Sequence, residues 1–369
     1  MNWEAIRAEF PALREWTYLN TATFGQVPRR AVEAVALHFA HRDESACSDF
    51  LDWFDDMDSI RASVSRLIQC QPGDIAFVTN ASSALGLVLA GLEWRRGDRV
   101  VTLEDEFPNN LYAPHALEER GIEFVECRWD QIRNAVNGRT RLVVVSSANY
   151  NTGFVAPLEE LSQLCRSNGA LLFVDGTQSV GALRFDVQAF QPDVLAVHAY
   201  KWLISPNGAG FVYVSPELRA RLQPNVVGWR SHHDWRSVDN LHHGTPVFSE
   251  KAEKYEGGGV SFALLYGMGA SVDMMLEIGP AAIEARVLDL ADQVKAVVRS
   301  LGGQVADYRS AIVAARFPDV DVSALARALR EKRVLVAARK GRLRVSPHFY
   351  NNEADIDTFA RELRAILTR

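Results

Sequence analysis

The stretch LLFVDGTQSVGAL, residues 171–183, decides the fold, because an apolar run ends in it at an acid, Asp175, and turns through a glycine. A second apolar run, AVHAYKWL at 196–203, contains Lys201 between two aromatic residues. Such runs are typical of strands that are buried on both faces of a parallel sheet. We therefore expect Asp175 and Lys201 at the carboxyl ends of neighbouring strands, where open α/β sheets bind ligands.

The rest of the chain extends this pattern. Further β-rich apolar runs begin at residues 99, 122, 140 and 210, and the helical pattern of 158–169 separates two of the strands. From about residue 280 the residue pattern changes, and it predicts a long amphipathic helix followed by a strand, a helix, a strand and a final helix. The pattern predicts an α/β protein with a large domain over 15–259 and a small α+β domain made of 1–14 and 260–369.

Composition excludes several classes of partner. The 369 residues carry 40 Lys and Arg against 46 Asp and Glu, a net charge of -6, which argues against nucleic acid and anionic membrane surfaces. No apolar run approaches the ~20 residues of a membrane span, and the first residues lack a signal core, so we expect a cytoplasmic protein. The cysteines are scattered without CxxC spacing, which disfavours a zinc site or a disulfide framework. They are Cys47, Cys70, Cys127 and Cys165.

The lysine and the acid at the two strand ends suggest one particular chemistry. A lysine that ends a buried strand loses hydration, which favours the neutral amine that forms a Schiff base with a carbonyl. A carboxylate on the neighbouring strand can hold a protonated ring nitrogen, as proteins do with pyridoxal 5′-phosphate (PLP). Taken alone, Lys201 is more simply a side chain that reaches water, and Asp175 a helix N-cap.

A phosphate site and a stacking ring are also suggested. The residues NASS at 80–83 open a helix, and the free N–H groups and hydroxyls of a helix start bind anions, although simple capping by Asn80 or Ser82 explains them as well. Phe107 follows a predicted strand and either stacks on a ring or packs into the core. The segment NASSALG also fits a nucleotide phosphate, but the chain lacks the glycine motifs of nucleotide loops there, and Lys201 stays unexplained.

In this order, the motifs resemble those of the class V aminotransferases of PLP fold type I. That group includes cysteine desulfurases, isopenicillin-N-epimerase-like proteins and kynureninases. The resemblance runs nearly end to end, and its most specific part is D-x-x-Q followed by H-x-x-K-W. It implies PLP as cofactor and a mostly parallel central sheet covered by helices, with a smaller α+β C-terminal domain. The segments that carry it are YLNTATFGQVPRRAVEAV, TNASSALGLVLAGL, FVDGTQSVGAL, HAYKWLISPNGAGFVYV and GRLRVSPHFYNNEADIDTF.

The resemblance also implies roles for individual residues. Lys201 would form the aldimine with PLP and move the proton of the substrate α-carbon, and Asp175 would pair with the pyridine nitrogen. Arg344 would clamp the substrate α-carboxylate, with Asn20 also assigned to the substrate. The other cofactor contacts implied are Gln178 at the phenolic oxygen, Ala81 (through its backbone), Ser82, His198 and Tyr200 at the phosphate, Phe107 stacked on the ring, and Asn149 near the ring oxygen, with Asn151 an alternative to Asn149.

The chain departs from the family pattern at two points. Many relatives carry a threonine that touches the phosphate of the partner subunit, and KYEGGGVSF at 254–262 has Gly259 in its place. A backbone N–H or Ser261 would have to replace the threonine. Cysteine desulfurases carry a nucleophilic cysteine shortly before the carboxylate-binding arginine, and here no cysteine follows Cys165. This disfavours a persulfide-forming desulfurase.

The function expected is that of a PLP-dependent class V aminotransferase acting on a small amino acid. A β-elimination lyase of the cysteine or cystine type and an epimerase are the alternatives, because the shared residues do not choose among these outcomes. A protein that binds PLP without catalysis is disfavoured, since Lys201, Asp175 and Arg344 are all present. The resemblance further implies a homodimer in which each active site is built from two subunits.

Overall fold

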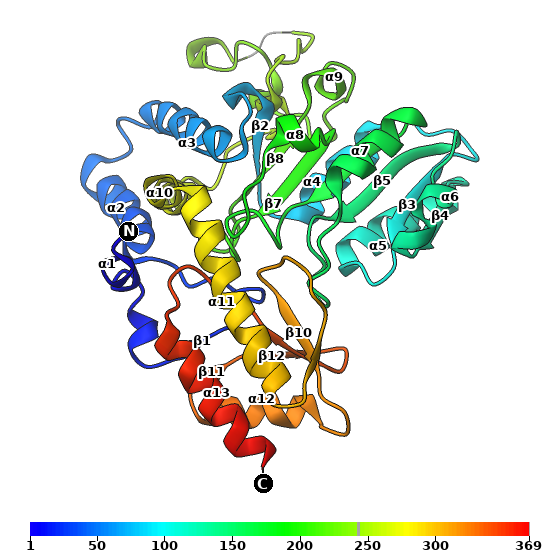
Figure 1. The fold of residues 1–369 in the computed structure, drawn as a ribbon. Coiled ribbons are helices and arrows are strands. Elements are labelled where there is room, and N and C mark those ends of the chain that lie inside the picture. Colours follow the sequence, from blue (N-terminus) through cyan, green and yellow to red (C-terminus); the bar gives the residue numbers. More distant parts are fainter. Residues whose placement is uncertain (242–243, 369) are drawn as a thin grey trace.

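A computed structural model describes residues 1–241 and 244–368. Its main feature is a seven-stranded sheet in the upper part of Figure 1. In sheet order the strands are β2 (Ile75–Val78), β8 (Gly210–Val214), β7 (Val194–His198), β6 (Leu171–Asp175), β5 (Thr140–Ser146), β3 (Arg99–Leu103) and β4 (Glu123–Cys127). Five adjacent strands are parallel, and β8 pairs antiparallel with both of its neighbours, β7 and β2.

The sheet is covered on both faces because its central strands are apolar throughout. In β6, Leu171 and Phe173 belong to one buried cluster, and Leu172 and Val174 belong to another. Side chains of a strand alternate between faces, so these are the two faces of the sheet. The helices that accompany the sheet are α3 (Asp52–Ile68), α4 (Ala81–Gly91), α5 (Pro108–His115), α6 (Ile132–Ala135), α7 (Leu158–Ser167), α8 (Val187–Phe190) and α9 (Pro216–Arg219).

A smaller α+β part lies below the sheet in Figure 1. Its four strands form an antiparallel sheet, and β1 (Thr17–Tyr18) pairs separately with β11 (Val334–Leu335). The elements of this part are α11 (Pro280–Ser300), β9 (Gln304–Val305), β10 (Val313–Arg316), α12 (Val322–Glu331), β12 (Ala337–Arg339), β13 (Arg342–Val345) and α13 (Glu353–Leu367). The observed architecture confirms the predicted fold class.

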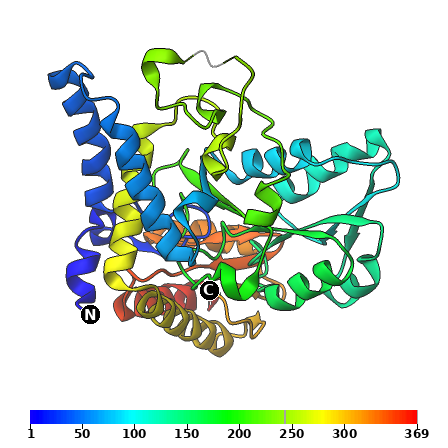
Figure 2. The same ribbon diagram turned by 90° about the horizontal axis from the view of Figure 1, so that it is seen from above.

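Helix α10 (Phe262–Ile278) connects the two parts and packs along α2 (Arg29–Ser45) and α3, at the edge of the molecule seen from above in Figure 2. The boundary proposed between residues 259 and 260 stays a prediction. Within the described residues, no single helix is long and apolar enough to cross a bilayer, although α10 and α11, bent by 84°, pass together on length and composition.

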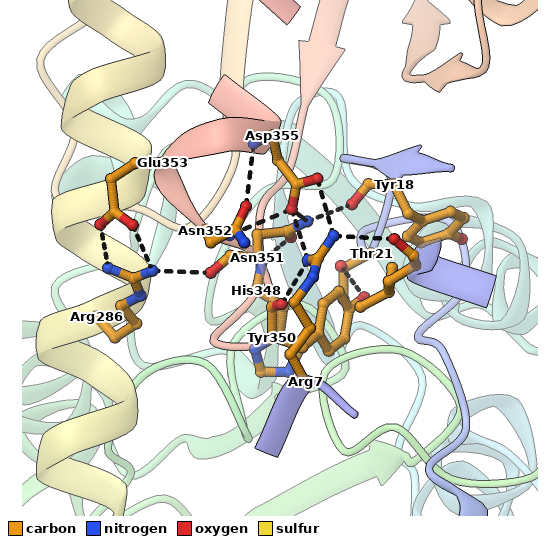
Figure 3. Close-up of polar contacts among 11 residues, drawn as sticks. Arg7, Tyr18, Thr21, Arg286, His348, Tyr350, Asn351, Asn352, Glu353 and Asp355 are labelled. Carbon is orange, nitrogen blue, oxygen red and sulfur yellow. Dashed lines mark hydrogen bonds and ion pairs between the residues drawn. The ribbon is translucent and has the colours of Figure 1, made fainter. Parts of the chain in front are cut away.

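The first residues of the chain are fastened to the last. The guanidinium of Arg7, in α1 (Trp3–Arg7), donates to both carboxylate oxygens of Asp355 and to the carbonyl of Tyr350. Figure 3 shows this cluster, in which Asn351 bonds to the same carboxylate and to the carbonyl of Tyr18. The N-terminal segment is therefore held beside the loop that follows β13, and from there it runs toward the end of the large sheet.

Candidate active site

The ends of the central strands bring the two decisive residues together. Asp175 is the last residue of β6, and it lies opposite Ala196 of the parallel strand β7. Lys201 follows shortly after β7 ends at His198, so both side chains emerge at the same edge of the sheet. They line one cavity, together with Ala81, Phe107, Asn109, Ser146, Tyr150, Thr177, Gln178, His198 and Tyr200.

Burial governs the protonation of the lysine and the acid. Lys201 is 6% exposed, and desolvation lowers the pKa of its amine to about 8, with Arg344 and Arg339 lowering it further and Asp175 opposing them. Burial raises the pKa of Asp175, against hydrogen bonding by Thr177 and the charge of Lys201. A substantial fraction of the amine is therefore neutral near pH 7 to 8, as a nucleophile requires.

His198 and Thr177 lie on the same side of the cavity. The backbone N–H of Thr177 donates to the Asp175 carboxylate (2.9 Å), and its hydroxyl accepts from the backbone N–H of His198 (3.1 Å). Burial, together with the charge of Lys201, lowers the pKa of His198 to about 4, so this ring is neutral at physiological pH. Its ring packs against that of Tyr200, with 4.2 Å between centroids.

A buried glutamate that sequence reasoning missed shapes the wall around Phe107. The Glu106 carboxylate accepts hydrogen bonds from the backbone N–H and hydroxyl of Ser146 and from the side chain of Asn110. It ties the start of α5 to the end of β5 and fixes the position of Phe107, whose ring centroid lies 5.3 Å from the Lys201 Nζ. The signal was available in the segment LEDEFPNN, in which a run of three acids that ends at Glu106 follows a buried strand.

Helix α4 begins at the cavity. Asn80 caps it by accepting from the backbone N–H of Ser83 (2.9 Å), and Ala81, its first residue, lines the cavity. Ser82 is exposed and does not line the cavity. Capping leaves other N–H groups of the first turn open to an anion, because the first four of a helix lack partners within it.

Arg344 lies at the domain junction and is 2% exposed. Its guanidinium donates to the carbonyl of Tyr150 (2.7 Å) and to the hydroxyl of Thr23 (2.6 Å), which in turn donates to Asn20 (2.8 Å). Its Nε has no partner among the described residues. Burial, then Arg339, lowers the pKa of Arg344 to about 10, which still leaves it charged at neutral pH. The geometry thus joins Asn20 to Arg344 through Thr23, a residue that the sequence reasoning did not single out.

Three of the expected residues are placed differently from the rest. Gln178 lines the cavity, but its amide donates to the carbonyl of Ala22 (3.1 Å) and accepts from the indole of Trp202 (3.0 Å). Asn149 does not line the cavity, and its side chain organises its own loop by accepting from the backbone of Asn151. Gly259 is exposed and lines a neighbouring cavity beside α4. The cofactor and substrate roles of all the expected site residues stay predictions.

The cysteines lie apart from this chemistry. None of the four lines the cavity, and all are free. Burial raises the pKa of Cys70 and of Cys165 to about 12, and that of Cys127 to about 11, which keeps these thiols protonated and unreactive. Within the described part of the chain, no group of His, Cys, Asp and Glu is arranged to hold a metal ion.

Comparisons with known proteins agree on one family. The family model Aminotransferase class-V matches residues 17–359. The chain is 27% identical over 400 residues to a probable cysteine desulfurase of Methanothermobacter thermautotrophicus, with 99% of this chain and 98% of that protein covered. It is 28% identical to the isopenicillin N epimerase of Streptomyces clavuligerus, with the same coverage.

Solved structures share the fold at lower identity. The apo cysteine desulfurase of Thermococcus onnurineus superposes with a TM-score of 0.88 at 22% identity, covering 99% of this chain and 98% of that one. The cystine C-S lyase C-DES in complex with cysteine persulfide superposes with a TM-score of 0.87 at 22% identity, covering 96% and 99%. Another structure of C-DES carries glycine covalently linked to its PLP cofactor.

The residues present fit PLP. The cavity offers a buried amine of lowered pKa, a buried carboxylate on the adjacent strand and the start of α4, which supply a nucleophile for the aldehyde, a partner for the ring nitrogen and donors for the phosphate. Because the family model spans nearly the whole chain and the fold agrees, the protein belongs to the class V aminotransferase family of PLP-dependent enzymes.

Proposed function

We propose that this enzyme transforms a small amino acid at its α-carbon, with transamination as the first assignment. One observation carries the proposal: Lys201 and Asp175, both buried, line one cavity at the ends of adjacent strands, and the charged Arg344 influences the same lysine. When bound, PLP withdraws electrons from the substrate α-carbon.

The residues divide the work as follows. Lys201 would hold the cofactor, and its amine, whose pKa of about 8 leaves part of it neutral near pH 7 to 8, would take the α-proton of the substrate. Asp175 keeps the ring nitrogen protonated, and its second role is to offset the positive charge at Lys201. The planar guanidinium of Arg344 would bind the substrate carboxylate through bidentate hydrogen bonds and so orient the substrate α-carbon.

At the other end of the cofactor, the first turn of α4, together with Ser82, His198 and Tyr200, is proposed to bind the phosphate. Phe107 covers the ring face, and Glu106 holds Phe107 in place. Gln178 is proposed to use its remaining amide hydrogen for the phenolic oxygen, and Asn149 to support the same side of the ring.

A β-elimination lyase is the second candidate. The specific observation in its favour is that no cysteine lines the cavity, which removes the persulfide acceptor of a desulfurase but does not affect elimination. C-DES is a cystine C-S lyase, and we propose the same type of activity as the second candidate for this chain.

The deciding experiment incubates the holoprotein with a panel of amino acids, with and without 2-oxo acids, and measures spectra and products. A 2-oxo acid formed only with an acceptor indicates transamination, ammonia or sulfide indicates elimination, and an inverted amino acid indicates an epimerase. Lys201→Ala should lower turnover by at least about 10²-fold, the usual contribution of a positioned acid–base group. Absence of any spectral change with every amino acid would overturn the proposed function.

We further propose a homodimer. Val226 (57% exposed) and Val227 (54% exposed) form an apolar loop tip, and Val226 lines the cavity beside α4 together with Gly259. Covering this tip with a second copy would bring partner groups to the phosphate side of the site. A cytoplasmic location fits the free state of the four cysteines.

A further inference from the structure

The hairpin of β12 and β13 carries more positive charge than the activity above requires. Four cations occur within residues 339–344: Arg339, Lys340, Arg342 and Arg344. The turn between the strands is tight, with Lys340 (φ 43°) and Gly341 (φ 73°) in the left-handed region, so the tip is narrow. The hairpin lies just before Arg344 in the sequence, where the family resemblance places the nucleophilic cysteine of cysteine desulfurases.

Strand register places three of these cations on one face. Arg344 lies opposite Ala337, and Arg339 lies opposite Arg342. Cross-strand partners point to the same side, and so do residues two apart along a strand. Arg339, Arg342 and Arg344 therefore share the face on which Arg344 bonds to Tyr150 and Thr23 beside the cavity.

Two contacts hold the hairpin tip against the large domain. Lys340 pairs with Asp105 (2.5 Å), which directly precedes the Glu106–Phe107 wall. The side-chain amide of Asn151, oriented so that its nitrogen donates to the Arg339 carbonyl (3.1 Å), accepts from Arg342 (3.2 Å). The backbone of Arg339 is thus fixed, on the face of the hairpin that carries Arg344.

The positive charges of this hairpin are not balanced by carboxylates. Lys340 uses Asp105, whereas Arg339, Arg342 and Arg344 form no ion pair with a carboxylate in the described residues 1–241 and 244–368. The Arg339 guanidinium donates only to the carbonyl of its neighbour Ala338 (2.9 Å), and the side chain is exposed. The Nε of the buried Arg344 is also unpartnered there. The field of Arg339 reaches the site itself, since it lowers the pKa of Lys201 and of Arg344.

A substrate with a single carboxylate neutralises only Arg344. Resting on the proposed function, we propose that the substrate is an amino acid whose side chain carries a second anionic group, a carboxylate or a sulfinate, and that Arg339 binds this group while Arg344 binds the α-carboxylate. A guanidinium is suited to both groups because it offers paired N–H donors to a planar or forked anion.

Binding alone tests the inference, independently of turnover. Calorimetric titration of the holoprotein compares succinate with butyrate, which has the same chain length but one carboxylate. We expect succinate to bind at least tenfold more tightly, Arg339→Gln to remove that advantage without changing butyrate binding, and Arg339→Lys to retain part of it. The matched control is Arg330→Gln, an exposed arginine on α12. Equal binding of the two acids, or an unchanged succinate affinity in Arg339→Gln, would overturn the inference.

Turnover measurements then distinguish the proposed function from the inference about Arg339, and a carboxylate from a sulfinate as the second anionic group. L-aspartate should be favoured over its neutral isostere L-asparagine in kcat/KM, and the ratio should fall at least tenfold in Arg339→Gln; L-cysteine sulfinate tests the sulfinate. If amino acids react but the ratio is unaffected by Arg339→Gln, the inference fails and the proposed function stands. If no amino acid reacts although succinate binding depends on Arg339, the proposed function fails instead.

Discussion

At the scale of single residues, the site works because a few polar groups are buried and each has a defined counterpart. Lys201 and Asp175 are 6% and 4% exposed, and burial acts on them in opposite directions, lowering one pKa and raising the other. Both shifts favour the neutral forms, and the electrostatic attraction between the two groups limits them. The lowered pKa of Lys201 therefore makes a neutral amine available near neutral pH.

The pKa of Lys201 predicts how the apoprotein takes up PLP. With a pKa of about 8, the reactive neutral amine increases from pH 6 to about pH 9 and then levels off, whereas an ordinary lysine would still be gaining neutral amine at about pH 10. We expect the rate of cofactor attachment, measured by borohydride reduction and mass spectrometry of the Lys201 peptide, to follow that curve. Lys201→Ala should show no attachment, and a rate still rising steeply above pH 9 would contradict the prediction.

Gly25 tests how closely the N-terminal segment approaches the lysine. Its N–H donates to the carbonyl of Tyr200 (2.9 Å), and a Cβ added to it would collide with the carbonyl oxygen of Lys201. Gly25→Ala should therefore displace the Lys201 backbone, lower the free energy of unfolding by about 1–3 kcal/mol and slow PLP attachment. Urea denaturation measures the first effect. Gly138→Ala, where a Cβ meets open space, is the control, and equal behaviour of both variants would refute the close approach.

At the scale of elements, the loop that follows β13 is joined to the loop that follows β7. His348 is fully buried, its Nδ1 accepts from the N–H of Phe349 (2.8 Å), and its Nε2 donates to the carbonyl of Trp202 (2.8 Å). Trp202 follows Lys201 directly, and its indole bonds to Gln178. The small part of the molecule thus supports the backbone that carries Lys201.

Protonation of His348 in the unfolded chain should destabilise the fold in acid. Burial lowers the pKa of His348 to about 3, whereas an unfolded histidine titrates near 6.5, so between these values the unfolded chain binds a proton that the folded chain does not. Stability then falls as pH drops through that window, with a slope of up to about 1.4 kcal/mol per pH unit from this residue. His348→Gln, which can still donate to Trp202, should flatten urea-derived stability between pH 6.5 and 5. An identical slope in both proteins would refute the assignment.

At the scale of the whole molecule, two ion pairs join distant segments of the chain to the residues at the start of α13. Arg7 binds Asp355, and Arg286 of α11 binds Glu353 and the carbonyl of Asn351, so the N-terminal helix and α11 both hold the start of α13 and the loop before it (Figure 3). Between them, the segment from Asn20 to Gly25 crosses from the small part to the large sheet. The candidate active site is therefore assembled from many stretches that are distant in sequence.

Subunit association is the prediction at this scale. If the tip formed by Val226 and Val227 is covered by a second copy, replacing both with Asp should convert a dimer to a monomer, because buried carboxylates without partners are costly. Sedimentation velocity measures the mass, and PLP affinity should fall in the same variant. Tyr112→Asp, at a side chain that is 71% exposed on α5, serves as control. A wild-type monomer with full activity would contradict the homodimer.

The sequence by itself determined the central sheet and the pair at its edge. The apolar runs around Val174 and Val197 have only one stable environment, a strand covered on both faces, and the residues that end such strands must meet at one edge. Only the tertiary structure decided which other groups surround them. The bonds of Glu106 to Ser146, of Thr23 to Arg344 and of His348 to Trp202 join segments far apart in the chain, and local residue patterns contain no information about such partners. The orientation of Arg339 likewise depends on hairpin register and docking, which no single segment specifies.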